Sequence, residues 1–118
     1  MLGGYQSDFA RNWSREGAGF DDPAAGGVRE ALAGAGVPAS QIETIHVANA
    51  FGQLFTGQGH LGAMAATVDD ELWGRPASRH EAACASGSVA LLAATAELEA
   101  GRYDTALVVG VELERTVP

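Results

Sequence analysis

A single cysteine, Cys84, is the most reactive side chain that the sequence offers. It lies in a run of small residues, Ala82–Ser88, where an extended segment is expected to turn into a helix. A helix that begins at Cys84 directs its unpaired N–H groups and the positive end of its dipole towards the sulfur. Such a setting favours the reactive thiolate, and the same N–H groups can stabilise an oxyanion. The pattern fits a nucleophile and an inert core thiol equally well, and position alone decides neither.

A second pattern suggests a different chemistry. Gly57, Gly59 and Gly62 spell the dinucleotide-binding pattern G-x-G-x-x-G, and Glu81 follows about twenty residues later, as a ribose-binding acid would. The pattern requires a strand that runs directly into the first glycine, whereas a predicted loop, Phe51–Thr56, intervenes here. An NAD-binding oxidoreductase domain therefore remains the alternative enzyme class.

The segment after the cysteine, Ala85–Ala96, contains no charged residue and has apolar side chains on all sides of the predicted helix. A helix that is apolar on every side is expected to be buried on every side. An aspartate at Leu92 should therefore disrupt the assembled fold. The positions where we expect this helix to return to water are Glu97, Glu99 and Arg102.

The remaining elements alternate between strands and helices. Predicted strands cover residues 2–5, 42–50, 77–83 and 105–111, and further predicted helices cover 21–35 and 61–72. The first of these helices starts at an Asp-Asp-Pro sequence, and the helix after the cysteine ends at Gly101. The order β-α-β-α-β-α-β is typical of an α/β fold with a mostly parallel sheet.

Composition narrows the class of protein. The chain has 118 residues, enough for one domain, and a net charge of −8 without a basic block, which argues against nucleic acid as a partner. No apolar run reaches the length of a membrane span, and the first residues do not resemble a signal peptide. One cysteine forms no internal disulfide, so we expect a reducing, cytoplasmic setting. No metal site is predicted.

The run Cys84–Ser88 with its alanine-rich helix, followed by Ala106–Glu112, resembles the thiolase superfamily. It is most similar to the sterol-carrier-protein-type thiolases and bacterial acetyl-CoA acetyltransferases. The resemblance extends to Val47–Gly52, which is similar to the second strand of the family, and to the Gly-Gln loop at Gly57–Gly59. Leu2–Phe9 resembles the first strand and the loop after it, so the similarity covers nearly the whole chain.

The resemblance implies the N-terminal half of a thiolase-like αβαβα sandwich with a buried central helix, formed by residues 1–118 as one domain. It implies that Cys84 attacks an acyl-CoA thioester, in thiolytic cleavage of a 3-oxoacyl-CoA or in Claisen condensation. The substrate is then a CoA thioester, no cofactor is permanently bound, and the role lies in lipid metabolism. The complete protein is expected to form a homodimer.

The partners that the family uses for acid–base chemistry, a second cysteine and a Gly-His-Pro motif, are absent from these residues. None of His46, His60 and His80 matches a catalytic histidine of the family, and we interpret His46 as a packed residue of a strand. The chain is therefore expected to be an N-terminal fragment or one piece of a split enzyme. Alone it should be inactive and leave the outer face of the Val89–Leu98 helix open to water. A thiolase-like fragment for lipid transfer or interaction, without catalysis, is the other alternative.

Overall fold

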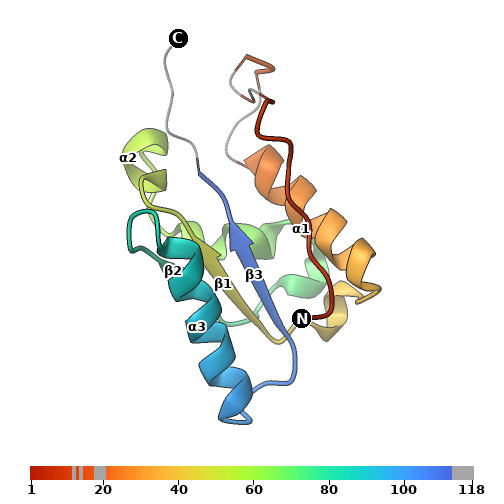
Figure 1. Cartoon of the computed structure of the whole chain (residues 1–118). Coiled ribbons are helices and arrows are strands. Elements are labelled where there is room, and N and C mark those ends of the chain that lie inside the picture. The colour runs from red at the N-terminus through yellow and green to blue at the C-terminus, as the bar shows by residue number, and fades with distance from the viewer. Residues whose placement is uncertain (12, 14, 18–20, 113–118) are drawn as a thin grey trace.

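The structure is a computed structural model that describes residues 1–11, 13, 15–17 and 21–112 (Figure 1). Its elements, with η for a 3-10 helix, are α1 (Asp21–Ala35), η1 (Ala39–Gln41), β1 (Thr44–Ala48), α2 (Gly52–Thr56), η2 (Leu61–Thr67), η3 (Asp70–Leu72), β2 (Ala77–His80), α3 (Ser86–Glu99) and β3 (Ala106–Gly110). The described strands form one parallel sheet in the order β2-β1-β3. The α/β class and the parallel sheet are as predicted.

The two faces of the sheet differ in what covers them. Side chains alternate along β1, so Ile45 and Val47 lie on one face and Thr44 and His46 on the other. The first face is covered by α1 and η2, and the main hydrophobic core lies there. Its buried members are Val28, Ile42, Ile45, Val47, Ala65, Leu72, Leu107 and Val109.

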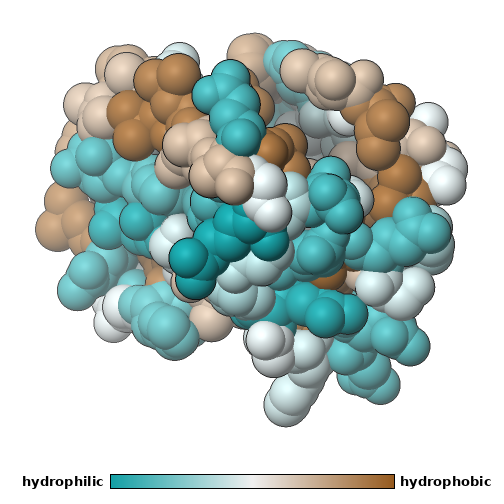
Figure 2. Space-filling model, turned by 90° about the horizontal axis from the view of Figure 1, so that it is seen from below, coloured by the Kyte–Doolittle hydropathy of each residue, from teal (hydrophilic) through white to brown (hydrophobic). Residues whose placement is uncertain are grey.

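Among the described elements, α3 covers the second face of the sheet, and it lies in front of the strands in Figure 1. The buried residues of α3 are Ser86, Ala90 and Ala94, one position per turn. Its other face carries the exposed hydrophobic residues Val89, Leu91, Leu92 and Leu98. The expected open outer face is thus present in this chain. In the view from below, hydrophobic residues gather in the upper part of the surface and hydrophilic residues in the middle and lower part (Figure 2).

The C-terminal end of α3 is closed as the sequence predicts. Gly101 has a left-handed φ of +71°, which glycine adopts without steric cost. Its N–H donates to the Leu98 carbonyl at 3.1 Å, and the Arg102 N–H donates to the Glu97 carbonyl at 3.0 Å. This pair of bonds is a Schellman motif, which satisfies carbonyls that the helix end leaves free.

The prediction of a first strand at Leu2–Tyr5 is wrong. This segment lies along α1, where Gly3 comes so close that an added Cβ would be 2.8 Å from the Ala35 Cα (Figure 1). The described sheet consists of β2, β1 and β3, and Leu2–Tyr5 does not pair with either of its edge strands.

The predicted helix 61–72 is also wrong as one element, because it is divided into η2 and η3. Asp69 interrupts it with extended dihedral angles, and its side chain accepts a hydrogen bond from the Glu71 N–H at 2.9 Å. The predicted loop Phe51–Thr56 instead contains α2, which ends at Gly57 with a φ of +69°. Among the described residues, no helix is both long and apolar enough to cross a membrane.

Candidate active site

Cys84 lies in the tight turn between β2 and α3. The predicted strand 77–83 ends at His80, and the helix starts at Ser86, two residues later than expected. The cysteine is exposed, which excludes the interpretation as an inert core thiol within this chain. Since the strands are parallel, the turn lies at the edge of the sheet where their carboxyl ends meet. This is the edge at which open α/β sheets bind ligands.

Hydrogen bonds hold this turn in one shape. The Ala85 N–H donates to the Ala82 carbonyl at 2.9 Å, and the Ser86 N–H donates to the Ala83 carbonyl at 3.2 Å. Ala83 itself has a φ of +50°, in the left-handed region that a residue other than glycine rarely adopts. The reversal of the chain immediately before the thiol is therefore sharp.

Two N–H groups at the start of α3 remain available. Within the described part of the chain, the N–H groups of Gly87 and Ser88 have no hydrogen-bond partner. The side chains around them are small, so a carbonyl oxygen of a bound ligand has access to both. Such N–H groups stabilise the negative oxygen that forms when a nucleophile attacks a carbonyl.

The residues of the dinucleotide alternative do not come together. Gly57 ends α2, and Gly62 is buried against β2, where an added Cβ would lie 2.7 Å from the Arg79 backbone nitrogen. Glu81 accepts a hydrogen bond from the Ala83 N–H with its carboxylate, so it serves the cysteine turn. The turn from strand directly into an α-helix that this motif requires is not found in this segment of the described chain.

The loop after β1 is fixed beside the same edge by a polar cluster that the sequence did not reveal. Arg79 donates to the Asn49 side-chain oxygen at 2.6 Å and to the Asn49 and Ala50 carbonyls at 3.1 Å each. The Glu112 carboxylate accepts from the N–H groups of Ala50 and Phe51, at 2.6 and 3.0 Å. These contacts join residues from three strand ends and make the edge rigid.

A pocket of about 230 Å³ lies near this cluster. Its lining residues are Gln53, Gly59, His60, Leu61, Gly62, Ala77, Ser78 and Arg79. Cys84 is not among them, so the candidate site is the open surface of the turn and not this pocket. No group of three or more His, Cys, Asp or Glu in the described part of the chain is placed to hold a metal ion.

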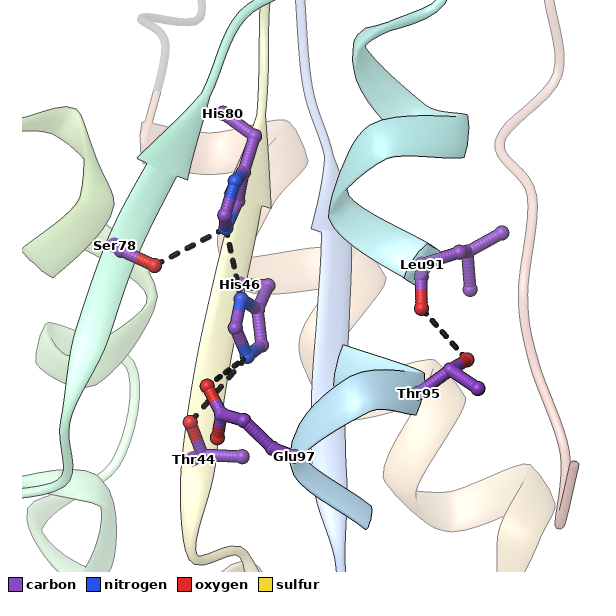
Figure 3. Close-up of polar contacts among 7 residues, drawn as sticks. All are labelled: Thr44, His46, Ser78, His80, Leu91, Thr95 and Glu97. Carbon is purple, nitrogen blue, oxygen red and sulfur yellow. Dashed lines mark hydrogen bonds and ion pairs between the residues drawn. The ribbon is translucent and has the colours of Figure 1, made fainter. Parts of the chain in front are cut away.

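A pair of histidines, which the sequence did not predict, lies between α3 and the sheet (Figure 3). His46 is 3% exposed, and its Nδ1 lies 2.8 Å from Nε2 of His80. On its other side, Nε2 of His46 lies 3.0 Å from a carboxylate oxygen of Glu97. The Ser78 hydroxyl oxygen lies 3.1 Å from Nε2 of His80, and the Thr44 hydroxyl oxygen lies 3.5 Å from Nε2 of His46. The interpretation of His46 as a packed strand residue is right about burial, but it missed the network.

The expected return of α3 to water at Glu97 is wrong. The Glu97 side chain is 27% exposed and points towards β1, where it faces His46 (Figure 3). One of its oxygens pairs with His46, while the other is buried without a partner in the described chain. The cause is geometric, since Glu97 follows Ala90 and Ala94 on the inner face of the helix.

The hydrogen bonds constrain the protons of this pair. Glu97 accepts, so Nε2 of His46 carries a proton, and the bond between the two rings has room for one proton only. Burial, followed by the neighbouring His46, lowers the pKa of His80, and Glu97 opposes this effect.

These observations agree with what the chain resembles among known proteins. A family model described as the thiolase N-terminal domain matches residues 12–117. The acetyl-CoA acetyltransferase of Methanocaldococcus jannaschii is 37% identical over 112 residues, which is 95% of this chain and 28% of that protein. The acetyl-CoA acetyltransferase of Methanothermobacter thermautotrophicus is 30% identical over the same shares of both chains.

The fold and the match together define the class: the chain belongs to the thiolase family, in the region of its N-terminal domain. The matched part of the chain covers 28% of the length of each of these two curated relatives. The resemblance that rested on the Cys84 run, the helix after it and the strand β3 is confirmed.

Proposed function

We propose that this chain forms part of an acyltransferase that acts on CoA thioesters, with Cys84 as the nucleophile. The observation that carries the proposal is the exposed thiol at the start of α3, beside the free N–H groups of Gly87 and Ser88. The relatives named acetyl-CoA acetyltransferase support the acyl-transfer class. Thiolytic cleavage of a 3-oxoacyl-CoA and the reverse Claisen condensation both fit this chemistry.

The chemistry proceeds in two half-reactions. In condensation the Cys84 thiolate attacks the thioester carbonyl carbon of an acyl-CoA, whereas in thiolysis it attacks the 3-oxo carbon of a 3-oxoacyl-CoA. In both cases the Gly87 and Ser88 N–H groups stabilise the resulting oxyanion. When the carbonyl re-forms in condensation, the carbon–sulfur bond breaks and CoA leaves as a thiolate. In thiolysis the bond between C2 and C3 breaks, and the remaining acyl-CoA leaves as an enolate that takes up a proton. The acyl group remains on the cysteine sulfur, and a second nucleophile removes it.

Other features of the complete protein belong to the same proposal. The single thiol of this chain leaves acid–base catalysis to residues outside it, so the chain alone is expected to be inactive. The exposed apolar face of α3 supports a covering layer from a C-terminal portion, and the complete protein is expected to be a homodimer. The lack of an internal disulfide partner supports a cytoplasmic setting and, with acyl-CoA as substrate, a role in lipid metabolism.

The test is acyl labelling of the purified chain with acetyl-CoA, read by intact-mass spectrometry and peptide mapping. It is run on the chain alone and mixed with the C-terminal portion of the Methanocaldococcus jannaschii relative. The expected result is an acetyl adduct on Cys84 in the mixture and its absence in a Cys84→Ser variant. An adduct that persists in Cys84→Ser, or 3-oxoacyl-CoA cleavage by the chain alone, contradicts the proposal.

A further inference from the structure

The residue before the cysteine has an unfavourable backbone conformation. Ala83 has a φ of +50°. In this region the Cβ of an L-residue comes close to the backbone, so the conformation persists only where neighbouring contacts hold it. A glycine would fit at this position without cost, but the sequence has alanine. Specific contacts must therefore hold Ala83.

The Ser86 side chain supplies two of these contacts. Its hydroxyl donates to the Ala83 carbonyl at 2.6 Å and accepts from the Ala82 N–H at 2.9 Å. Ser86 is only 5% exposed, so water does not compete effectively for these groups. Because the Ala83 carbonyl belongs to the peptide unit that joins Ala83 to Cys84, the hydroxyl fixes the plane directly before the thiol.

The Glu81 side chain fixes the plane on the other side of Ala83. Its carboxylate accepts from the Ala83 N–H, which belongs to the peptide unit between Ala82 and Ala83. The two side chains thus hold both peptide planes whose relative rotation defines φ and ψ of Ala83. Glu81 is exposed, so its hydrogen bond to the Ala83 N–H is weaker than the hydrogen bond of Ser86 to the Ala83 carbonyl.

We propose that Ser86 and Glu81 are positioning residues for Cys84. By holding Ala83 in the left-handed conformation, they direct the Cys84 thiol to the open side of the turn, beside the N–H groups of Gly87 and Ser88. Without them, Ala83 relaxes to an ordinary conformation and the peptide plane before the cysteine rotates. This inference rests on the proposed role of Cys84 as the nucleophile. It explains why Glu81 and Ser86 flank the cysteine.

The rate of alkylation by iodoacetamide tests the inference, because Cys84 is the only thiol and its thiolate displaces the iodide. Ser86→Ala should lower the rate at neutral pH by about tenfold, the factor that matches the strain of one left-handed residue. Glu81→Ala should lower the rate by about threefold, since its bond is exposed.

Three further variants separate positioning from a loss of fold. Ser86→Thr retains the hydroxyl and should restore the rate to within about twofold of the wild type. Thr95→Ala removes another hydroxyl of α3, one that bonds the Leu91 carbonyl at 2.8 Å far from the turn, and should leave the rate unchanged. Far-UV circular dichroism of each variant checks that the helices remain.

The sharpest test combines Ser86→Ala with Ala83→Gly. Glycine adopts the left-handed region without steric cost, so the loss of the Ser86 hydroxyl should then cost about twofold instead of about tenfold. Equal losses in the alanine and glycine backgrounds would overturn the inference, and so would a Ser86→Ala variant that reacts as fast as the wild type. A wild-type thiol that reacts no faster than a cysteine in an unstructured peptide would instead overturn the proposed nucleophile itself.

Discussion

The two ends of α3 differ in their chemistry and in their exposure to solvent. At its N-terminal end, the exposed Cys84 lies beside free backbone N–H groups, and small side chains leave the site open. At its C-terminal end, the Glu97 carboxylate faces the buried His46, which in turn contacts His80. At the first end, backbone N–H groups are the polar groups of the site, and the Cys84 thiol is exposed to solvent. The second acts through ionisable side chains that are taken out of solvent.

The difference explains how α3 is held. The main hydrophobic core lies on the other face of the sheet and contains no residue of α3. Under α3 the contacts come from small residues, Ala90 and Ala94, which bury little apolar area. The pair of Glu97 and His46 adds a polar contact between α3 and the sheet to these small apolar ones. A change at this end should affect stability, whereas a change at the other end should affect chemistry.

The largest expected effect is at the chemical end. Cys84→Ser should reduce acyl transfer in the complemented protein to background, because a hydroxyl lacks the nucleophilicity of a thiolate. Its free energy of unfolding should stay within about 0.5 kcal/mol of the wild type, since the side chain is exposed. Acyl labelling and urea denaturation measure the two quantities. A serine variant that still accepts the acyl group would move the nucleophile elsewhere.

The next effect is at the buried end and has a matched control on the same helix. Glu97→Ala should destabilise the chain by about 1–3 kcal/mol, because it leaves Nε2 of the buried His46 without its acceptor. Glu99→Ala removes the same charge from an exposed position and should change stability by less than about 0.5 kcal/mol. Urea midpoints at neutral pH compare the two. Equal midpoints would mean that the Glu97–His46 contact contributes nothing.

A conservative variant refines this comparison. Glu97→Gln keeps an oxygen that accepts from His46 and should retain most of the stability that Glu97→Ala loses. If both variants lose the same amount, the negative charge is the stabilising feature and the hydrogen bond alone is not.

A smaller effect should follow pH. Because burial and His46 lower the pKa of His80 in the folded chain, the unfolded chain binds a proton more readily. This contribution to stability is fully present above the unfolded value of about 6.5 and is lost as pH falls below it. Urea midpoints should therefore decrease from about pH 7 to about pH 5. The His80→Gln variant should flatten this decrease.

His60→Asn is the control for that titration. His60 is exposed and has a φ of +58°, which asparagine also tolerates. The decrease below pH 6.5, the region of ordinary histidine titration, should persist in this variant. If the decrease vanishes in His60→Asn and persists in His80→Gln, His60 and not His80 takes up the proton, and the prediction is wrong.

The sequence predicted the chemical end of α3 better than the buried end for a physical reason. Small residues before a helix are a local signal of a turn, and this signal lies at the chemical end. At the other end only the cap at Gly101 has such a local signal. The network of His46, His80 and Glu97 joins three distant segments and follows from the register of the strands. In that register His80 lies beside Ala48, two residues beyond His46 on the same face of β1. Only the sheet order reveals this neighbourhood.

The failed predictions have the same origin. Leu2–Tyr5 has the composition of a strand, but in the fold it lies against α1, with Gly3 close to Ala35, and pairs with no strand of the described sheet. The apolar composition of α3 predicts a helix that is buried on every side, but in this chain only one face of the helix is buried. It did not signal that Glu97 lies on the inner face, because a charge near a helix end is usually exposed.

The smallest expected effect on stability concerns the outer face of α3, between the two ends. Leu92 is 69% exposed, so Leu92→Asp buries no charge in the chain alone and should change its free energy of unfolding by less than about 0.5 kcal/mol. It should nevertheless reduce self-association and ANS binding, because it breaks an exposed apolar surface. In the presence of a covering C-terminal portion, the same aspartate would be desolvated and should prevent assembly. Size-exclusion chromatography with and without that portion measures both outcomes. Strong unfolding of the isolated variant would show that this face is already covered in the chain alone.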